Sequence, residues 1–206
     1  SQVPAKKTRF ITYCQRIAAI LLLPAIIAIV ALMMKKDHQE PLIAYNEVTA
    51  PYGMVSSLTL PDSSKVWLNA GSTLKYPAAF TSNVREVEMS GEAYFEVHAD
   101  KEHPFIVNTG DLKVTATGTA FNICSFAKAQ EEVITLVTGK VAVSQENNIK
   151  HLLPGQQLNY QRASKSMEIT DIDTYKYISW KDGILAFRDD PLKSIFNRLE
   201  QVYQVR

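Results

Sequence analysis

Apolar and polar residues alternate along most of the chain between residue 52 and about residue 170. The clearest example is the segment 112–117, Leu-Lys-Val-Thr-Ala-Thr, in which every second residue is apolar. A period of two sends successive side chains to opposite faces of a strand, so one face of this segment is expected to be buried. The same pattern recurs at Val87 and Met89, Phe95 and Val97, Phe105 and Val107, and Val141 and Val143.

Two further segments refine this pattern. Residues 84–89 predict a strand with Val87 and Met89 in the core and with Arg85, Glu86 and Glu88 facing water. Residues 133–137 are more continuously apolar, which is typical of a strand covered on both faces. An α-helical stripe does not compete with these strands.

Turn residues separate the predicted strands at short intervals. Pro61-Asp62-Ser63-Ser64 joins the segments 55–60 and 65–68, and the Asp62 side chain is suited to bonding backbone amides two residues on. Similar turns are expected at residues 69–72, 109–111, 138–140 and 153–156. This density of turns predicts a mainly β fold, a roll or sandwich of many short strands.

The pattern changes after residue 171. Residues 171–181 predict a connecting segment with some helix and an aromatic anchor, and residues 184–187 predict a short strand. Asp190 and Pro191 then have the residue types of an N-cap and a first helical position. A helical apolar stripe follows, made of Leu192, Ile195, Phe196, Leu199, Val202 and Tyr203.

A strand and one helix cannot bury that stripe by themselves. Residues 204–206 have the composition to begin a further strand, so the segment from residue 172 onward is expected to open a small second α+β module that is cut short. The six stripe residues are therefore candidates for contact with another element or with a partner protein.

Near the N-terminus, residues 17–34 form an uncharged apolar run of 18 residues. A helix of this length spans roughly the hydrocarbon core of a bilayer, and such helices tolerate a proline like Pro24. Four basic residues precede the run without an acid, which predicts a single transmembrane helix with a cytoplasmic N-terminus. A cleaved signal peptide is the rival, but the run ends in Leu-Met-Met-Lys-Lys and lacks a small-residue cleavage site.

Charge divides at the same point. Residues 1–36 hold six Lys or Arg and no acid, whereas the remaining residues hold 16 basic against 21 acidic residues, a net charge of −5. Such an acidic balance argues against a nucleic-acid partner, since phosphates require a basic face. Cys14 and Cys124 flank the apolar run and are not expected to pair within the chain, so Cys124 is interpreted as a small core residue.

Several segments, taken together and in order, resemble the FecR family of transmembrane anti-sigma regulators. The matching segments are residues 58–70 (Leu-Thr-Leu-Pro-Asp-Ser-Ser-Lys-Val-Trp-Leu-Asn-Ala), 91–97 (Gly-Glu-Ala-Tyr-Phe-Glu-Val), 103–107 (His-Pro-Phe-Ile-Val), 118–123 (Gly-Thr-Ala-Phe-Asn-Ile), 180–183 (Trp-Lys-Asp-Gly) and the amphipathic stretch ending at 199–203. One departure is Ser63, where the family usually has glycine, and the turn is expected to absorb it if its backbone does not require a positive φ. The other is the short segment of 16 residues before the membrane, where the family carries a larger sigma-binding region.

The resemblance implies a division of the chain into five parts: a cytoplasmic remnant (1–16), a transmembrane helix (17–34), a linker (35–51), a periplasmic β domain (52–171) and a connector with a truncated module (172–206). That module is similar to the secretin and TonB short N-terminal domain. The implied function is to relay a signal from an outer-membrane TonB-dependent transporter, across the inner membrane, to a cytoplasmic ECF sigma factor. No enzymatic activity, cofactor or metal is implied.

Candidate catalytic and metal-binding residues are weak. Glu92 and Glu96, four apart on a strand, would lie roughly 13 Å apart, beyond the carboxylate spacing of glycosidases. His98, Asp100 and His103 have metal-ligand residue types, yet solvated loop residues explain them better. The glycines at 91, 118 and 139 are not followed by a helix and are interpreted as turns or bulges. For the aromatic residues Trp67, Tyr94, Phe95 and Trp180, burial is favoured over a ligand groove.

Two functions of different classes remain open at this point. The first is the non-enzymatic signal relay through protein–protein contacts. The second is a membrane-anchored periplasmic module that binds a small ligand or a glycan directly. A hydrolase would need convergent carboxylates or a nucleophile with its base, and the spacing of such residues in the sequence supplies neither.

Overall fold

The computed structural model describes residues 44–188 and 190–203, without the side chain of residue 201, together with residues 16, 22, 24–27, 29 and 30. The chain divides into two compact units, residues 1–42 and 43–206. The described residues of the first unit are helical and exposed.

Most of the predicted transmembrane segment 17–34 lies outside the described residues, as do residues 1–15, linker residues 35–43 and the predicted strand at 204–206. Among the residues that are described, no helix combines the length and the apolar character needed to cross a membrane.

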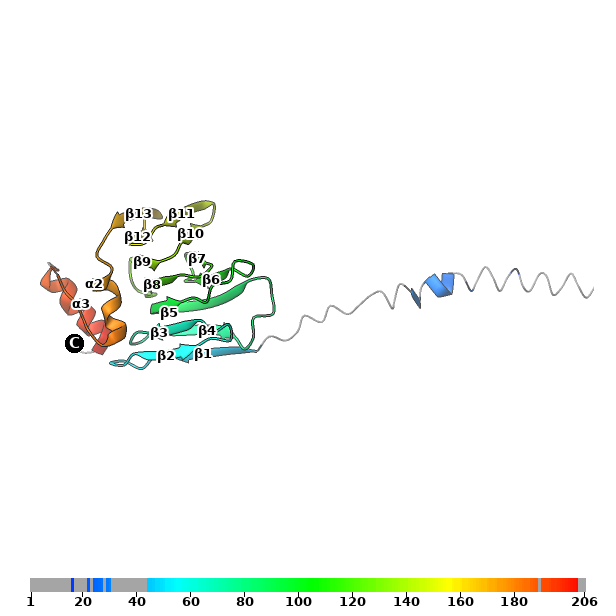
Figure 1. The fold of residues 1–206 in the computed structure, drawn as a ribbon, viewed down its shortest axis with the longest axis horizontal. Helices are drawn as coiled ribbons and strands as arrows, with labels where there is room; N and C mark the ends of the chain where they lie inside the picture. Colours follow the sequence, from blue (N-terminus) through cyan, green and yellow to red (C-terminus); the bar gives the residue numbers. More distant parts are fainter. Residues whose placement is uncertain are drawn as a thin grey trace, which may run out of the picture. The chain divides into compact units, whose positions relative to one another are not determined.

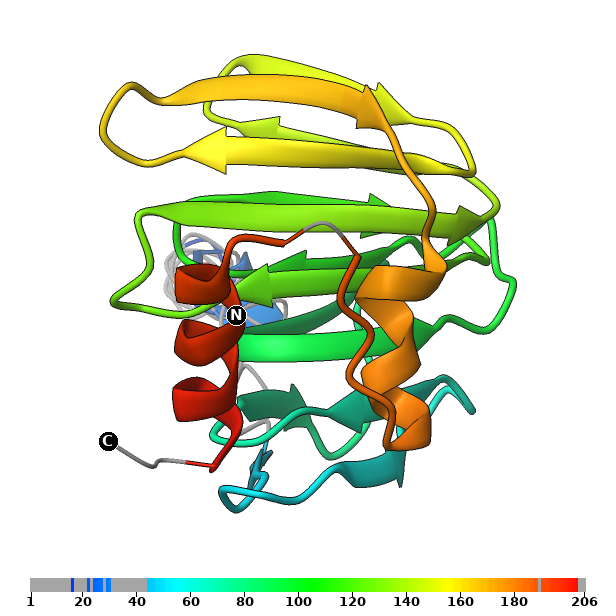
Figure 2. The same ribbon diagram turned by 90° about the vertical axis from the view of Figure 1, so that its left-hand side faces the viewer.

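The 13 strands described in the second unit form one continuous hydrogen-bonded sheet that bends into two halves (Figures 1 and 2). We call the halves sheet A and sheet B. In spatial order, sheet A contains β1 (Tyr45–Thr49), β4 (Thr73–Pro77), the first half of β5 (Arg85–Glu96), β6 (Phe105–Asn108), β7 (Lys113–Ala116), β10 (Val141–Gln145) and β11 (Asn148–Leu152). Sheet B contains β2 (Ser56–Thr59), β3 (Lys65–Leu68), the second half of β5, β8 (Ala120–Ser125), β9 (Glu131–Thr138), β12 (Gln156–Gln161) and β13 (Ser166–Asp171).

Strand β5 belongs to both halves because it changes partners along its 12 residues. Its first part pairs with β4 and, in parallel, with β6, and its second part pairs with β3 and β8. Gly91 stands at the change with a φ of +108°, and a Cβ there would lie 2.6 Å from the Cα of Ser72. Glycine is therefore required where the strand bends between the two halves.

The inner faces of sheets A and B share one hydrophobic core. The ring of Phe95 on β5 stacks on Phe121 of β8 at a centroid distance of 5.2 Å and meets Phe105 of β6, in sheet A, at 6.1 Å. All three side chains are completely buried. The prediction of a mainly β fold with many short strands is thus confirmed, and the strands form a rolled, nearly closed sheet.

Several predicted boundaries are wrong. Residues 45–49, assigned to the linker, form edge strand β1, which pairs with β4. Residues 184–187 are not a strand; the segment has no hydrogen-bonded ladder partner.

The prediction for Arg85 is also wrong. The alternation predicts a side chain that faces water, whereas Arg85 is only 4% exposed. Its guanidinium contacts Asp62 (Nη1 to Oδ2, 2.6 Å) and donates to the carbonyl oxygens of His103 and His98 at 2.8 and 3.1 Å. A buried charge needs such partners, so these contacts explain how an arginine is accommodated at an inward position.

The connector after β13 is helical, as predicted. It contains α2 (Tyr175–Ile178) and a 3₁₀ turn (Ser179–Asp182), and Trp180 is its buried aromatic anchor. The last described element is α3 (Leu192–Tyr203). Figure 2 shows α2 and α3 in front of the same side of the roll, so both cover the outer face of sheet B.

Candidate functional site

A buried polar arrangement lies where the C-terminal segment covers sheet B. Asn122 on β8 connects the two layers, since its Oδ1 accepts a hydrogen bond from the Trp180 indole Nε1 at 3.2 Å and its Nδ2 donates to Glu92 at 3.2 Å. Asn122 and Trp180 are each 2% exposed. Trp180 therefore fixes the amide of Asn122 and, through it, the neighbouring carboxylate.

Glu92 is the centre of this arrangement. Its side chain is 3% exposed and accepts from Asn69 Nδ2 at 2.7 Å, in addition to Asn122. Its backbone amide donates to Ser72 Oγ at 2.8 Å, which holds the residue on the far side. The two amide donors to the carboxylate come from the turn after β3 and from β8, and Ser72, which accepts from the Glu92 amide, directly precedes β4. The roll itself therefore holds the carboxylate in place. We call this group, Glu92 with Asn69, Asn122 and Ser72, the Glu92 socket.

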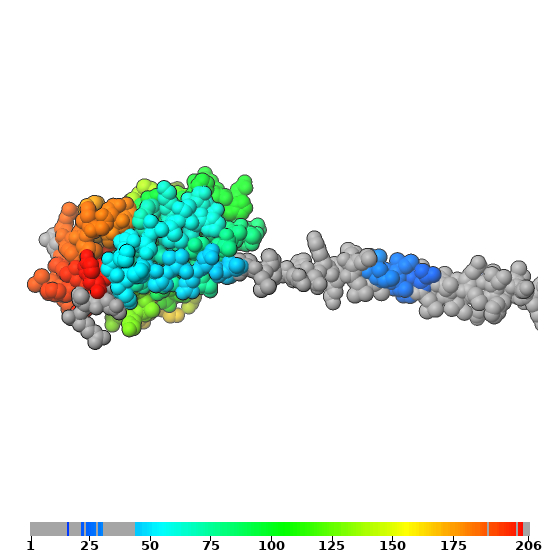
Figure 3. Space-filling view, turned by 90° about the horizontal axis from the view of Figure 1, so that it is seen from below, coloured from blue at the N-terminus to red at the C-terminus, as the bar shows by residue number. Residues whose placement is uncertain are grey.

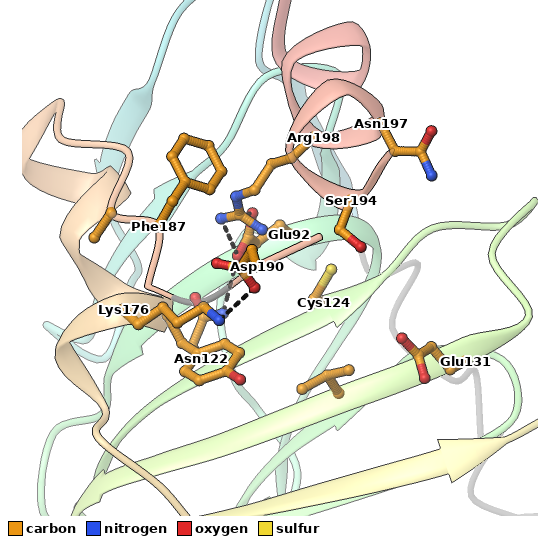
Figure 4. A pocket seen from close by; sticks show the side chains of 13 residues that line it. Glu92, Asn122, Cys124, Glu131, Lys176, Phe187, Asp190, Ser194, Asn197 and Arg198 are labelled. Atoms are coloured by element: carbon orange, nitrogen blue, oxygen red, sulfur yellow. Dashed lines mark hydrogen bonds and ion pairs between the residues drawn. The ribbon is translucent and has the colours of Figure 1, made fainter. Parts of the chain in front are cut away.

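Arg198 of α3 enters the socket from above (Figure 4). Its Nη2 lies 3.2 Å from Glu92 Oε1 and 3.1 Å from Oε2. Burial opposes the charge of Arg198, but the Glu92 carboxylate outweighs this effect and the pKa of the guanidinium is raised. The Arg198 guanidinium is therefore charged under all ordinary conditions.

A cavity of about 350 Å³ remains beside this ion pair, between sheet B and the C-terminal segment. Lys176 of α2 and Asp190 form a second ion pair in its wall, with Nζ 2.6 Å from Oδ1 (Figure 4). The hydrogen bond from Lys176 lowers the pKa of Asp190 below its ordinary value. Asp190 also accepts from the Arg188 amide at 3.1 Å, so its carboxylate does not cap α3 as the sequence predicted.

Cys124 lies in the same wall. Burial, with a further contribution from Glu92, raises the pKa of its thiol, which stays protonated and unreactive. Its placement differs from the prediction, because Cys124 is on the outer face of β8, whereas the neighbouring Ile123 belongs to the core.

Comparison with known proteins now identifies the family. The model of the family "FecR protein" matches residues 46–150, half of the chain. The chain belongs to the FecR family.

Solved structures agree with this membership. Two crystal structures of a proposed anti-sigma factor from Parabacteroides distasonis ATCC 8503, at 2.50 and 1.65 Å resolution, share 34% sequence identity with the chain. The first has a TM-score of 0.74 and the match covers 78% of this chain and 76% of that one; the second has a TM-score of 0.73 with 77% and 75% covered. No curated protein matches the chain.

The six residues of the predicted interaction stripe do form one helix, but they do not share one environment. Ile195, Leu199 and Val202 are half-buried against the roll. Leu192, Phe196 and Tyr203 remain 71%, 61% and 53% exposed. In this FecR chain α3 thus presents an apolar ridge of these three side chains to solvent.

The other candidate residues have structural surroundings. Glu96 is exposed while Glu92 is engaged in its socket, so these two carboxylates do not form a catalytic pair. His103 Nδ1 lies 2.8 Å from Asp100 Oδ2 at the surface. The described part of the chain contains no group of three His, Cys, Asp or Glu side chains arranged to hold a metal.

The aromatic candidates lie on two different faces of the sheet. Phe95 is in the inner core, whereas Trp67 and Tyr94 pack edge to face on the outer side of sheet B at 5.7 Å, with Lys181 Nζ over both rings. Burial, followed by the nearby Glu96 and Asp182 carboxylates, raises the pKa of Tyr94 to about 12. The burial of Tyr94, Phe95 and Trp180 confirms the interpretation favoured by the sequence.

Sequence reasoning missed Asn69, Asn122 and Arg198. The first two lie within the segments that carry the FecR resemblance, and Glu92 lies in a third. Asn69 follows a strand in a predicted turn, Asn122 alternates with the core residues Phe121 and Ile123, and Arg198 lies between apolar positions of a helix. A polar residue is ordinary at each of these positions, so the spacing carries no signal for them.

Proposed function

We propose that this FecR protein is a non-enzymatic anti-sigma regulator of the inner membrane, anchored by residues 17–34 with a cytoplasmic N-terminus. In this proposal the β roll and α3 are periplasmic and receive a signal from the signalling domain of an outer-membrane TonB-dependent transporter. The signal passes through the single membrane helix to a cytoplasmic ECF sigma factor and so regulates transcription.

One observation carries the proposal: the family match spans the roll from residue 46 to residue 150, and structures 34% identical to the chain belong to a proposed anti-sigma factor. The exposed ridge of α3 supports it, because apolar side chains with a polar rim are typical of a surface for a protein partner. The charge division around the apolar run supports the orientation.

The test is binding between the full chain and the signalling domains of TonB-dependent transporters from the same organism. Phe196→Asp places a charge on the exposed ridge and is expected to weaken binding at least tenfold. Asn197→Asp is the matched control, since it adds the same charge at the next exposed position and should leave binding within twofold. Equal binding by the wild type and Phe196→Asp would exclude the ridge, and binding to none of the domains would contradict the relay.

A second candidate function rests on the cavity beside Arg198. Its volume of about 350 Å³ is at the lower end for small-molecule sites, and its wall combines apolar side chains with several polar and charged ones. Direct binding of a small ligand or a glycan should then raise the melting temperature of the chain when candidate compounds are titrated. If a transporter domain binds the chain and the compounds do not change its melting temperature, the relay is favoured.

A further inference from the structure

We propose that α3 is a releasable arm, clamped to sheet B by the insertion of Arg198 into the preformed Glu92 socket. The inference deepens the proposed relay, on which its biological meaning rests, by naming the element that moves. Its physical content concerns this chain alone and is argued from three observations on α3 and its contacts.

The first observation is that apolar packing holds α3 only in part. None of the described side chains of the helix is fully buried: Ile195, Leu199 and Val202 are half-buried, and the outward-facing Leu192, Phe196 and Tyr203 are more than half exposed. The cavity of about 350 Å³ lies between sheet B and the helix residues Ser194, Asn197 and Arg198. By contrast, Trp180 in the preceding turn is 2% exposed, so the connector is packed more closely than α3.

The second observation is that the socket does not depend on Arg198. Asn69 and Asn122 hold the two oxygens of Glu92, and each amide is itself fixed: Asn69 Oδ1 accepts from the Ala70 amide at 2.8 Å and Asn122 Oδ1 accepts from Trp180. When Arg198 leaves, Glu92 keeps these two donors and gains water from the opened side. Departure of the arm therefore does not strand an unpaired charge in the interior, which is the usual reason that a buried ion pair cannot open.

The third observation is a second attachment that leads to the N-terminal strand. The carbonyl oxygen of Val202, one turn beyond Arg198, accepts from the Gly53 amide at 2.7 Å, and Figure 3 shows the end of α3 against the β1–β2 region. Ala50, in the same loop, donates to the Ser72 carbonyl at 2.9 Å, and Ser72 Oγ is part of the socket. Both attachments of α3 thus converge on the loop that follows β1.

The base of the arm is held separately. The Lys176–Asp190 ion pair, whose two side chains are 28% and 19% exposed, fixes the residues just before α3 to α2. The pivot of the arm therefore lies at Pro191, between this fixed point and Arg198. Opening about this pivot removes Arg198 from Glu92 and Val202 from Gly53, and it loosens the loop after β1.

The experiment is amide hydrogen exchange on the full chain without any partner, so that a failed search for a transporter domain has no bearing on it. Arg198→Ala should speed exchange of the amides of residues 197–203 and of Gly53 about 10- to 100-fold, as expected for loss of a charge-assisted pair. Exchange at Ile123 and Ile134, in the core strands of sheet B, should be unchanged. Arg188→Ala is the matched control, since that arginine forms an exposed ion pair with Asp173.

Two further measurements separate a clamp from ordinary structural damage. Raising salt from 0.05 to 0.5 M should speed exchange of α3 in the wild type severalfold but not in Arg198→Ala, because the contact between Arg198 and Glu92 is charged and partly open to solvent. Arg198→Lys keeps the charge and should give an intermediate rate. The proposal is overturned if exchange of α3 is the same in Arg198→Ala as in the wild type, or if Ile123 and Ile134 accelerate by the same factor as α3.

Discussion

The contacts that hold the two sheets of the roll together differ in kind from those that hold α3 on the roll. Within the roll, sheets A and B meet through completely buried aromatic and aliphatic side chains such as Phe95 and Phe121. Between the roll and α3, the apolar side chains Ile195, Leu199 and Val202 are only half-buried, and the named polar contacts are an ion pair and a backbone hydrogen bond beside a cavity. Apolar burial scales with area, whereas a few polar contacts can be broken one at a time and charged ones are screened by salt. From this difference we infer that the roll is the fixed part of the domain and that α3 is the part that can be released.

The largest expected effect comes from the core of the roll. Phe95→Ala removes a ring that contacts Phe121 in sheet B and Phe105 in sheet A, and it should lower the free energy of unfolding by about 3–5 kcal/mol. Phe196→Ala, the same change on the exposed ridge of α3, should cost under about 0.5 kcal/mol. Urea denaturation measures both, and similar losses in the two variants would remove the distinction between the regions.

The next effect tests whether polar contacts inside the roll differ from those of α3. Arg85→Ala removes the cationic partner of Asp62, which keeps only its hydrogen bonds from Ser64, and removes a donor to two backbone carbonyls at a site that is 4% exposed. It should therefore lower the free energy of unfolding by about 3 kcal/mol. Lys75→Ala breaks an exposed ion pair with Glu88 and should cost under about 1 kcal/mol. A thermal melt that shifts equally for both variants would contradict the structural role of Arg85.

Ser63 offers a gain of stability. It has a φ of +70°, so the turn after β2 does require the positive φ that the sequence comparison left conditional. Ser63→Gly should raise the free energy of unfolding by about 1 kcal/mol, because a Cβ is strained in this conformation. Ser57→Gly in β2 is the control and should lower it by about 0.5 kcal/mol, since glycine weakens a strand. A destabilised Ser63→Gly variant would show that its side chain contributes more than its strain costs.

The smallest effect concerns pH at the base of the arm. The pKa of Asp190 is lowered by Lys176, so the folded form binds the proton less tightly than the unfolded chain, whose ordinary value is 3.8. The stabilisation, about 0.5 kcal/mol, is therefore present above pH 3.8 and is lost as pH falls through the lowered pKa. An NMR titration of the Asp190 carboxyl should give a midpoint below 3.8 in the wild type and a higher midpoint in Lys176→Met. Identical midpoints would show that Lys176 is not the cause.

The strands of the roll were predictable because their signal is local. In residues 113–116 the buried residues Val114 and Ala116 alternate with Lys113 and Thr115, as the spacing indicated. Strand β1 was missed because its five residues are all exposed or half-buried at the edge of sheet A. The strand predicted at 184–187 is absent: Ala186 and Phe187 line the cavity, and the segment pairs with no strand.

The candidate site was not predictable from spacing. Arg198 and Glu92 are 106 positions apart, and Asn69 and Asn122 lie 23 and 30 positions from Glu92. The pairing of β5 with β3 and β8, together with the placement of α3 over sheet B, brings these side chains to one place. The helix that carries Arg198 was predicted from its stripe, yet the residue that attaches it is the charged one between the apolar positions.

The double membership of β5 also has a consequence for how the domain acquires its structure as the chain emerges from N- to C-terminus. By residue 96 the strands β3 and β4, its neighbours on one side, have already been made. Its neighbours on the other side, β6 and β8, become complete only at residues 108 and 125. One edge of β5, the longest strand of the roll, therefore has no pairing partner until these strands are synthesised. Incorrect strand pairing is most favoured during this interval.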